Sequence, residues 1–552
     1  MTGNRAAIFA DREYLVAAVL LAAVLVLGLA TAADYGITTD EFIFNGYGPR
    51  ALAWYTSGFS DRSLYDHFDV MLYGPWFQIL VAIAQSLGLA HPFETRHAVT
   101  FVIGLSGIAA LLPIGRIAVG RWAGFIAIVL CLTTGQLYGH LFFNPNDVPF
   151  LAAMTWTTLA VMIMARGEVP SWGATIMAGV LTGLAIATRF GGILSQAYLA
   201  GAMALCVLDL ALRTGGGAKA AIFAIAGRTA AALAIGWATT IALWPLLQTA
   251  NPIEQFKSVY DQQSFLYVDF EFPHWGQIVS SHALPWHYLP GQLLARLPEA
   301  FIALLAIALL FGAARLAILI ARCVTRWRRL GPAGLLAPMR LLARSRGLMV
   351  VIVAALGPPI FIVIKQAVIF DGLRHVLFIL PPLALLAAWG LLRLTPLIIR
   401  FPVVATAVAA AHLITTVPVM VALHPYEYIA MNSFTGGVSG AYGRFDLDYW
   451  SAAATEALRR LEARLQADGS ERFATRTPRI LICIPWREHM VAPMFRRPWR
   501  IEHDPRAADF IIATERYPCG KDAGGALIDE VVRFGQPLAW TLQIPHPGNP
   551  HD

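Results

Sequence analysis

Ionisable residues stand at the ends of apolar runs in several short stretches of the sequence. Asp40 and Glu41 follow the first apolar run, and Asp147 lies where two later runs meet. Arg374 and His375 immediately precede another apolar run. Charged groups so close to hydrocarbon are costly unless they have a partner or a function. Carboxylates can take a proton from a hydroxyl group, and a guanidinium at a helix start suits a phosphate. The pattern therefore indicates acid–base chemistry on a phosphate-bearing substrate.

Each of these residues also has a purely structural interpretation. Thr39 or Asp40 could cap a helix that begins at Glu41, and Asp147 could cap the helix that follows it. For Asp40 and Glu41, the sequence is equally compatible with capping and with catalysis. The long cationic side chains could simply extend to the membrane interface. If the acids meet, one could act as a base while another orients a group or binds a cation. The candidate substrate-binding residues are then Asn144, Arg189, Lys365, Arg374 and His375.

The composition places most of the chain in a membrane. Of the 552 residues, 57% are hydrophobic and 14% are charged, against about 25% charged in soluble globular proteins. The net charge of +7 does not indicate nucleic acid binding, because the arginines stand at the ends of apolar runs and form no aromatic-interleaved patch. Apolar runs recur from Tyr14 to about Leu423. We expect a transmembrane catalytic domain at 1–445 and a small soluble α/β domain at 446–552.

The distribution of arginine sets the predicted topology. The loop from Arg322 to Arg346 carries the strongest positive charge and should face the cytoplasm. If the apolar stretch 71–90 crossed the membrane, the basic connection at 116–121 would lie on the outer side. We therefore expect 71–90 to form a periplasmic juxtamembrane or re-entrant helix. The result is an all-α polytopic bundle of about eleven transmembrane helices. They are expected near 14–33, 97–115, 122–140, 148–165, 171–188, 191–212, 229–248, 299–321, 347–366, 374–393 and 401–423.

An odd number of helices places the C-terminal part and the loops with the candidate residues on the same outer side. There, 479–485, 508–514 and 538–544 have the pattern of buried strands, with helices expected near 451–467 and 490–495. Cys483 and Cys519 could form a disulfide if this part is extracytoplasmic, or remain two buried thiols. This domain could bind the acceptor or simply cap the bundle, and we expect structural support.

Taken in order, these motifs resemble the GT-C class of lipid-linked glycosyltransferases. The similarity lies in the Asp40-Glu41 pair after the first helix, in the stretch 144–150 and in the stretch 374–382. It is greatest for the protein O-mannosyltransferase and aminoarabinose transferase-like branch, which is glycosyltransferase family 39-like. The stretches 286–290 and 424–450 are also similar to that branch. The resemblance covers roughly residues 10–450.

The resemblance implies an inverting transfer of a hexosyl or pentosyl group from an undecaprenyl or decaprenyl phosphate to an acceptor hydroxyl. Asp40 would be the general base, Glu41 would support it or help to bind a cation, and Asp147 would position the acceptor or a metal ion. Arg374, with Arg189, would neutralise the departing lipid phosphate. The reaction would occur at the periplasmic face of the bacterial inner membrane, with a lipid, glycan or protein as acceptor.

A divalent metal ion remains an unassigned cofactor. Metal-binding members of the class pair an acid with a histidine from a later outer loop. Here His274, His282 and His287 are candidates, but their spacing is not diagnostic.

The alternative function is that of a polytopic transporter or flippase for a lipid-linked or anionic substrate. Transporters often show inverted repeats and interrupted helices near the bilayer midplane. We find no repeat in this sequence, and its charges stand at helix ends on one side. A purely structural scaffold would leave the outer acids unexplained.

Overall fold

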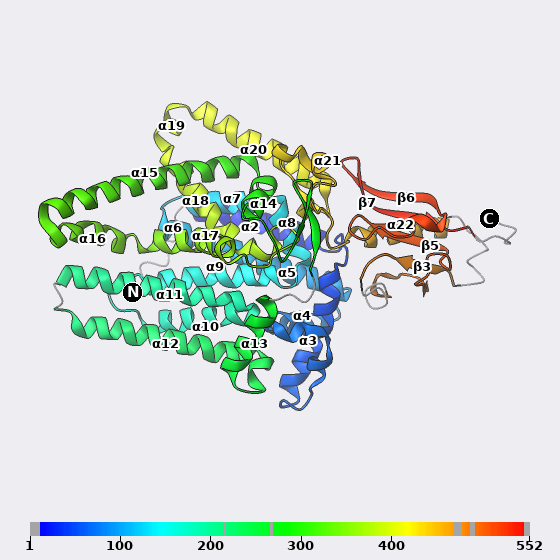
Figure 1. Ribbon diagram of the computed structural model, residues 1–552, viewed down its shortest axis with the longest axis horizontal. Coiled ribbons are helices and arrows are strands. Elements are labelled where there is room, and N and C mark those ends of the chain that lie inside the picture. The colour runs from blue at the N-terminus through cyan, green and yellow to red at the C-terminus, as the bar shows by residue number, and fades with distance from the viewer. Residues whose placement is uncertain (1–11, 215–216, 265–268, 468–476, 486–491, 546–552) are drawn as a thin grey trace.

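The computed structural model describes residues 12–214, 217–264, 269–467, 477–485 and 492–545. Figure 1 shows a long bundle of helices with a small sheet domain at one end. The chain is a multi-pass membrane protein.

The bundle consists of long apolar helices. Among the described residues, nine helical segments are long and apolar enough to cross a membrane. The helices α7 (Ala123–Leu132) and α8 (Gly135–Phe143), which meet at an angle of 74°, make a tenth if the pair counts as one span. The 17-residue helix α10 (Trp172–Thr188) lies at the remaining predicted position. The predicted helical bundle is confirmed. The nine spans are α2 (Arg12–Thr31), α5 (Pro92–Ala109) with α6 (Leu111–Ala118), α9 (Asp147–Met164), η3 (Phe190–Ile193) with α11 (Leu194–Thr214), α12 (Lys219–Leu243), α15 (Glu299–Leu330) with η5 (Gly331–Leu335) and α16 (Leu336–Arg344), α17 (Arg346–Lys365), η6 (Arg374–Ile379) with α18 (Leu380–Arg393), and α20 (Pro402–Leu423).

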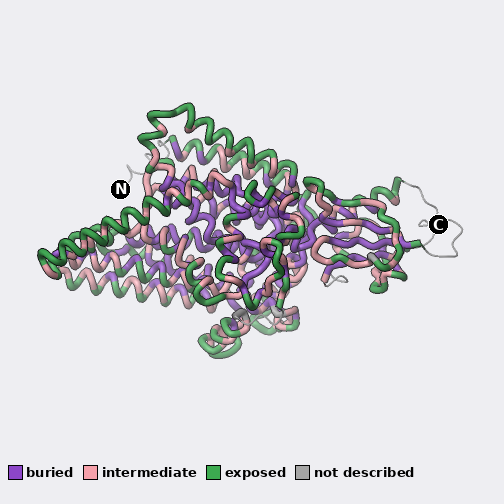
Figure 2. Tube along the Cα trace, turned by 45° about the horizontal axis from the view of Figure 1, so that its top comes forward, coloured by how far each residue is buried: buried purple, intermediate pink, exposed green. Residues whose placement is uncertain are grey.

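Two of these spans form the centre of the bundle. Within the hydrophobic segment of α9, 89% of the residues are buried, and 83% are buried in η6 with α18, whereas the figure for α20 is 6%. Figure 2 shows the same contrast between the middle of the bundle and its outer helices. Large apolar side chains such as Val403 of α20 and Leu310 of α15 are exposed, as a lipid-facing surface requires. The helices that begin at Asp147 and Arg374 are therefore held rigidly by packing.

Shorter helices cover the end of the bundle next to the sheet domain, which we call the site end. They include α3 (Thr39–Thr56), α13 (Pro252–Ser264), α14 (Tyr288–Arg296) and the 11-residue α4 (Trp76–Ser86). At 1.5 Å per residue, α4 extends only about 16 Å and is too short to cross the hydrocarbon. The structure thus has a juxtamembrane helix where the sequence predicted one.

The turn before α4 packs closely against the end of α10. A Cβ atom at Gly74 would lie 1.7 Å from the carbonyl oxygen of Ala187, so only glycine permits this approach. Next to it, the Trp76 indole donates a hydrogen bond to Thr188 Oγ1 at 2.7 Å. These contacts fix the end of α10 immediately before Arg189.

The C-terminal part is a small α/β domain, as predicted. Its five strands have the order β4-β3-β5-β7-β6, with β3 parallel to β4 and β5 and the other pairs antiparallel. Helix α22 (Ala453–Ala467) packs against this sheet. The strands are β3 (Arg479–Ile482), β4 (Arg500–Ile501), β5 (Phe510–Thr514), β6 (Ala526–Arg533) and β7 (Gln536–Gln543).

Some details of this domain differ from the sequence prediction. The helix expected near 490–495 is only a 3₁₀ turn at Ala492–Met494 within the described residues. Strands β4 and β6 were not predicted, because β4 has two residues and β6 is largely exposed and carries charged side chains. Cys483 and Cys519 form a disulfide. The domain and the bundle share one continuous hydrophobic core.

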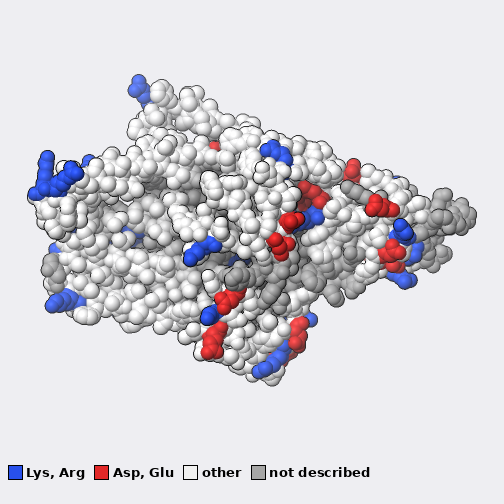
Figure 3. Space-filling model, in the orientation of Figure 1, with Lys and Arg blue, Asp and Glu red and all other residues white. Residues whose placement is uncertain are grey.

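Charges are distributed unevenly between the two ends of the bundle. Figure 3 shows lysine and arginine side chains at the turn between α15 and α16, far from the sheet domain, while acidic side chains gather towards that domain. We call the end with the α15–α16 turn the basic end. This distribution fits the predicted orientation, in which the basic end faces the cytoplasm.

Candidate active site

Glu41 lies at the beginning of α3 with its side chain turned into the protein. Its carboxylate accepts a hydrogen bond from the Thr38 backbone N–H at 3.0 Å, and its own N–H donates to Thr38 Oγ1 at 3.3 Å, which is a capping box. Glu41 Oε1 is 2.8 Å from His97 Nε2, and the side chain is fully buried. The sequence prediction of the cap is wrong in its position: the helix begins at Thr39 and Thr38 caps it, because the Thr38 hydroxyl and the Glu41 carboxylate form the reciprocal pair of hydrogen bonds. The structure does not bring Glu41 together with the other candidate acids.

Asp40, one residue earlier, faces a different environment. Its side chain is 29% exposed, and its Oδ2 accepts a hydrogen bond from Arg374 Nη1 at 2.7 Å. Arg374 starts η6, and its Nε is 3.1 Å from Asp371 Oδ2. The guanidinium lies over the rings of Phe370 and Trp450, at 4.8 and 5.2 Å from their centroids. Asp40 is therefore an accessible carboxylate held by a guanidinium that is fixed on its other sides.

A second pair of opposite charges lies beside the first. Asp147, at the start of α9, forms an ion pair with Arg189, at the end of α10. Asn144 orients this acid, since its amide Nδ2 donates to Asp147 Oδ2 at 3.1 Å and its Oδ1 accepts from the Asp147 N–H at 2.8 Å. Arg189 lies within electrostatic range of both Asp40 and Arg374. The four charged residues therefore belong to one site.

The two remaining candidates lie at the margin of this site or outside it. His375 is partly buried, with its ring edge-on to Phe370 at 4.6 Å and within electrostatic range of Arg374. Lys365 is exposed at the end of α17. Its position fits the interfacial role that its long side chain allows.

Sequence reasoning missed a group of charged residues directly behind Arg374. One carboxylate oxygen of Asp371 pairs with Arg374, and the other lies 3.7 Å from Arg516 Nη2. Arg516 Nη1 is in turn 2.9 Å from Asp446 Oδ2. Burial raises the pKa of Asp446 to about 6, against the lowering effect of Arg516. The dipeptide Asp371-Gly372 is a turn signal that could have been noticed, but Arg516 lies in a segment with no recognisable motif.

A hydrogen-bonded chain links the Asp147 side of the site to this group. Asn144 Nδ2 is 3.2 Å from His140 Nδ1, and His140 Nε2 is 2.7 Å from the Tyr449 hydroxyl. Gln136 contacts both Tyr449 and Arg296, and Arg296 donates to the Asp446 carbonyl oxygen at 2.7 Å. Since buried polar groups are stable only with partners, this chain rigidifies the floor of the site.

The described residues do not fit a metal centre at this site. No group of three or more histidine, cysteine or acidic side chains within the described part of the chain could hold a metal ion. The Asp147 carboxylate is engaged by Arg189 and Asn144, and His274 Nδ1 is 3.3 Å from Gln292 Nε2. We therefore assign no step to a metal ion.

The fold is similar to that of lipid-linked glycosyltransferases of known structure. ArnT from Cupriavidus metallidurans, crystallised with undecaprenyl phosphate, aligns with a TM-score of 0.50 and 14% identity over 95% of this chain and 97% of ArnT. AglB, an oligosaccharyltransferase from Archaeoglobus fulgidus, aligns with a TM-score of 0.44 and 11% identity over 90% of this chain and 69% of AglB. No protein-family model and no curated protein sequence matches the chain.

The ArnT alignment defines the fold. The chain has the GT-C fold, as the resemblance of its motifs predicts, and the ArnT alignment covers both the bundle and most of the C-terminal domain. At 14% identity the similarity concerns the fold, so the reaction has to be argued from the site itself.

Proposed function

We propose that this protein is an inverting glycosyltransferase that moves a sugar from a polyprenyl phosphate donor to an acceptor hydroxyl. The proposal rests above all on the contact between Asp40 and Arg374. The accessible carboxylate of Asp40 has one hydrogen bond to a guanidinium, which an incoming anion could replace, so it is suited to a reaction in which an anion binds and a base is needed. A second guanidinium–carboxylate pair, Arg189 with the buried Asp147, lies beside it.

The donor phosphate would compete with Asp40 for Arg374. A phosphate that takes the Nη donors of Arg374 frees the carboxylate of Asp40, while Asp371 keeps its hold on Nε. Binding of the donor would thus uncover the base. The negative charge that develops on the leaving phosphate is stabilised by Arg374 and Arg189, both already oriented by acids.

The reaction is then a single displacement. Asp40 takes the proton of the acceptor hydroxyl as its oxygen forms a bond to the anomeric carbon. The bond from that carbon to the phosphate oxygen breaks, and the phosphate leaves with the electron pair. Because the leaving group is already an anion, no proton donor is required for its departure. Attack opposite to the departing phosphate inverts the anomeric configuration.

The other residues would place the acceptor. Asp147 is buried, but Arg189 beside it is 17% exposed, so an acceptor polar group that displaces Arg189 would meet a carboxylate oriented by Asn144. His375 and the Phe370 ring lie at the edge of the same site. We propose that the site end faces the outside of a bacterial cytoplasmic membrane, with residues 446–552 as an extracytoplasmic domain.

The proposal is tested with purified protein in lipid nanodiscs and a panel of labelled polyprenyl-phosphate sugars. The wild-type protein should transfer sugar from at least one donor to membrane-extract acceptors, and Asp40→Asn should abolish the transfer while remaining folded. Transfer by the Asp40→Asn variant at a near wild-type rate would reject the proposed base. Transport of the donor across the membrane of proteoliposomes without any transfer would favour a flippase instead.

A further inference from the structure

The C-terminal domain extends one charged side chain into the region behind Arg374. Arg516 lies two residues after the end of β5, and its side chain is only 14% exposed. It contacts Asp371, which belongs to the turn before η6, and Asp446, which precedes α22. Asp371 therefore lies between two guanidinium groups, one from the bundle and one from the C-terminal domain.

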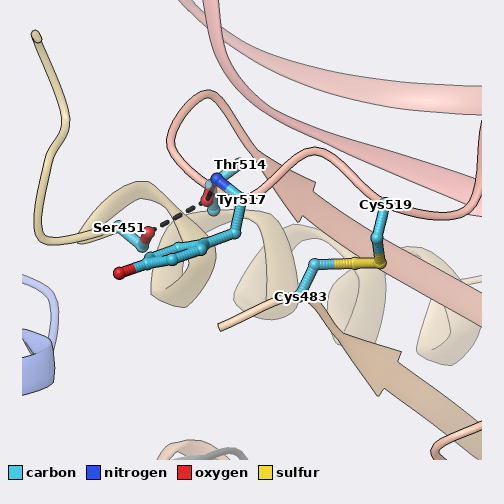
Figure 4. Close-up of a disulfide and its surroundings, with 5 residues drawn as sticks. All are labelled: Ser451, Cys483, Thr514, Tyr517 and Cys519. Atoms are coloured by element: carbon cyan, nitrogen blue, oxygen red, sulfur yellow. Dashed lines mark hydrogen bonds between the residues drawn. A yellow bond between two sulfur atoms is a disulfide. The ribbon is translucent and has the colours of Figure 1, made fainter. Parts of the chain in front are cut away.

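The segment that carries Arg516 is fixed at several points. We call residues 515–519 the β5 loop. At its start, the Thr514 and Ser451 hydroxyl oxygens are 2.9 Å apart, and the Tyr517 N–H donates to Thr514 Oγ1 at 3.3 Å. At its end, Cys519 is joined to Cys483. Figure 4 shows the loop between these two attachments.

The same domain also contacts the chain just before Asp40. The Ile37 N–H donates to Thr455 Oγ1 of α22 at 3.1 Å. A Cβ atom at Gly36 would lie 2.4 Å from the Ala452 carbonyl oxygen, so the two segments are in close contact. The domain thus holds both members of the Asp40–Arg374 pair, one through the backbone before Asp40 and the other through Asp371.

We propose that Arg516 is a positioning residue for the phosphate-binding Arg374, so that the C-terminal domain completes the donor site as well as covering it. The inference deepens the function proposed above and rests on it. With Arg516 in place, Asp371 stays charged and fixed. It then keeps its contact with Nε of Arg374 while the Nη atoms exchange Asp40 for the donor phosphate. Without Arg516, Asp371 and Asp446 would keep their burial and lose a compensating charge.

The groups that face Asp371 set the direction of a pH effect. The charged groups are Arg374, Arg516, Asp40, Arg296 and Asp446, and the tyrosine hydroxyls are those of Tyr288, Tyr449 and Tyr517. Burial raises the pKa of Asp371, and the arginines oppose this rise. Replacing Arg516 by glutamine should raise the pKa of Asp371 further. The acid then becomes neutral at a higher pH, and the acidic limb of the activity profile moves upwards in pH.

The first test needs no donor and therefore does not depend on the proposed reaction. Thermal unfolding of the full-length protein in nanodiscs is measured for Arg516→Gln, Arg374→Gln and the double variant. Coupling through Asp371 predicts that the double variant loses clearly less than the sum of the two single losses. Strictly additive losses would overturn the proposal. If Arg516→Gln does not fold, Arg516→Lys takes its place in the cycle.

The second test uses transfer from the donor that the wild-type protein accepts. Arg516→Gln should raise the donor KM about tenfold or more, within the usual range of coupling energies. The acceptor KM should not change, and Arg516→Lys should recover part of the loss. Arg506→Gln is the matched control, because Arg506 is an exposed arginine of the same domain outside this group. Wild-type donor KM and pH profile in Arg516→Gln would overturn the proposal.

The unfolding cycle and the transfer assay together distinguish failure of the proposed function from failure of the inference about Arg516. A wild-type protein that transfers from no donor, with a non-additive cycle, rejects the proposed function and leaves Arg516 as a positioning residue of Arg374. Transfer that depends on Arg374 but not on Arg516 rejects the inference and leaves the proposed function intact.

Discussion

Two adjacent carboxylates in this protein have different surroundings, and the difference arises at the scale of single residues. Asp40 and Glu41 both lie in the first turn of α3. Successive helical residues point in directions about 100° apart, so one side chain faces the open site while the next faces α5 and its His97. The pair of acids that resembles a known motif therefore combines one candidate base with one structural residue.

Substitution of these two acids should separate activity from stability. Asp40→Asn should abolish transfer with little change in stability, because the amide oxygen can still accept from Arg374. Glu41→Ala should cost on the order of 3 kcal/mol of unfolding free energy, since it leaves His97 and the cap without their buried partner. Denaturant unfolding and transfer assays on both variants check this. Loss of transfer in Glu41→Ala at full stability would contradict it.

Glu515 should make the stability of the protein depend on pH. Burial and the nearby acids Asp448 and Asp446 raise its pKa to about 8, against about 4.5 in the unfolded chain. A carboxyl group with a raised pKa in the folded state is most stabilising below the unfolded value, and its contribution falls as the pH rises through about 8.

The measurement is the melting temperature between pH 5 and pH 9. The difference between Glu515→Gln and the wild-type protein should change in favour of the variant as the pH rises. Glu530→Gln is the matched control, because Glu530 is an exposed glutamate on β6. A difference that stays constant over this pH range would show that Glu515 is already charged in the folded protein.

At the scale of elements, the long helices were predictable and the turns that shape the site were not. Each of the eleven predicted apolar runs is helical in the described residues, and nine of them contain a helix long and apolar enough to cross a membrane, because run length is a local property that hydrocarbon thickness fixes. The pairing of Asp40 with Arg374 was expected only as convergence on one side, since the two residues are 334 positions apart. Arg516 was not predicted, because nothing in its own segment reveals that β5 points it at Asp371.

The turn at Asp371-Gly372 is the element most sensitive to a small change. Gly372 has φ +69°, and a Cβ atom there would lie 3.0 Å from the Arg296 guanidinium. Gly372→Ala combines a left-handed backbone with this close contact, so we expect a loss of about 1–3 kcal/mol. Thermal unfolding measures it.

The same variant should also weaken donor binding, because the turn carries Asp371. The matched control is Gly443→Ala, where φ is +71° but no heavy atom lies within 4 Å of the added Cβ. Equal losses in the two variants would show that backbone strain alone matters and that the packing on Arg296 does not.

At the scale of the whole molecule, the uneven charge of the two ends sets the orientation. The site end should face outwards and the basic end inwards. The test uses a variant that lacks the free cysteines Cys131, Cys206 and Cys323. One cysteine is then introduced at an exposed position, either by Ser60→Cys at the site end or by Arg329→Cys at the basic end. A membrane-impermeant maleimide should label the first in intact cells and the second only after permeabilisation. The reverse pattern would invert the topology.

A cryo-EM structure of the full-length protein in nanodiscs with undecaprenyl phosphate would show directly whether Arg374 binds the donor phosphate. We expect the phosphate to lie on the Nη atoms of Arg374, Asp40 to be released from this guanidinium, and Asp371 to remain in contact with Nε. A bound phosphate away from Arg374, with the Asp40–Arg374 contact of 2.7 Å unchanged, would show that Arg374 does not bind the donor.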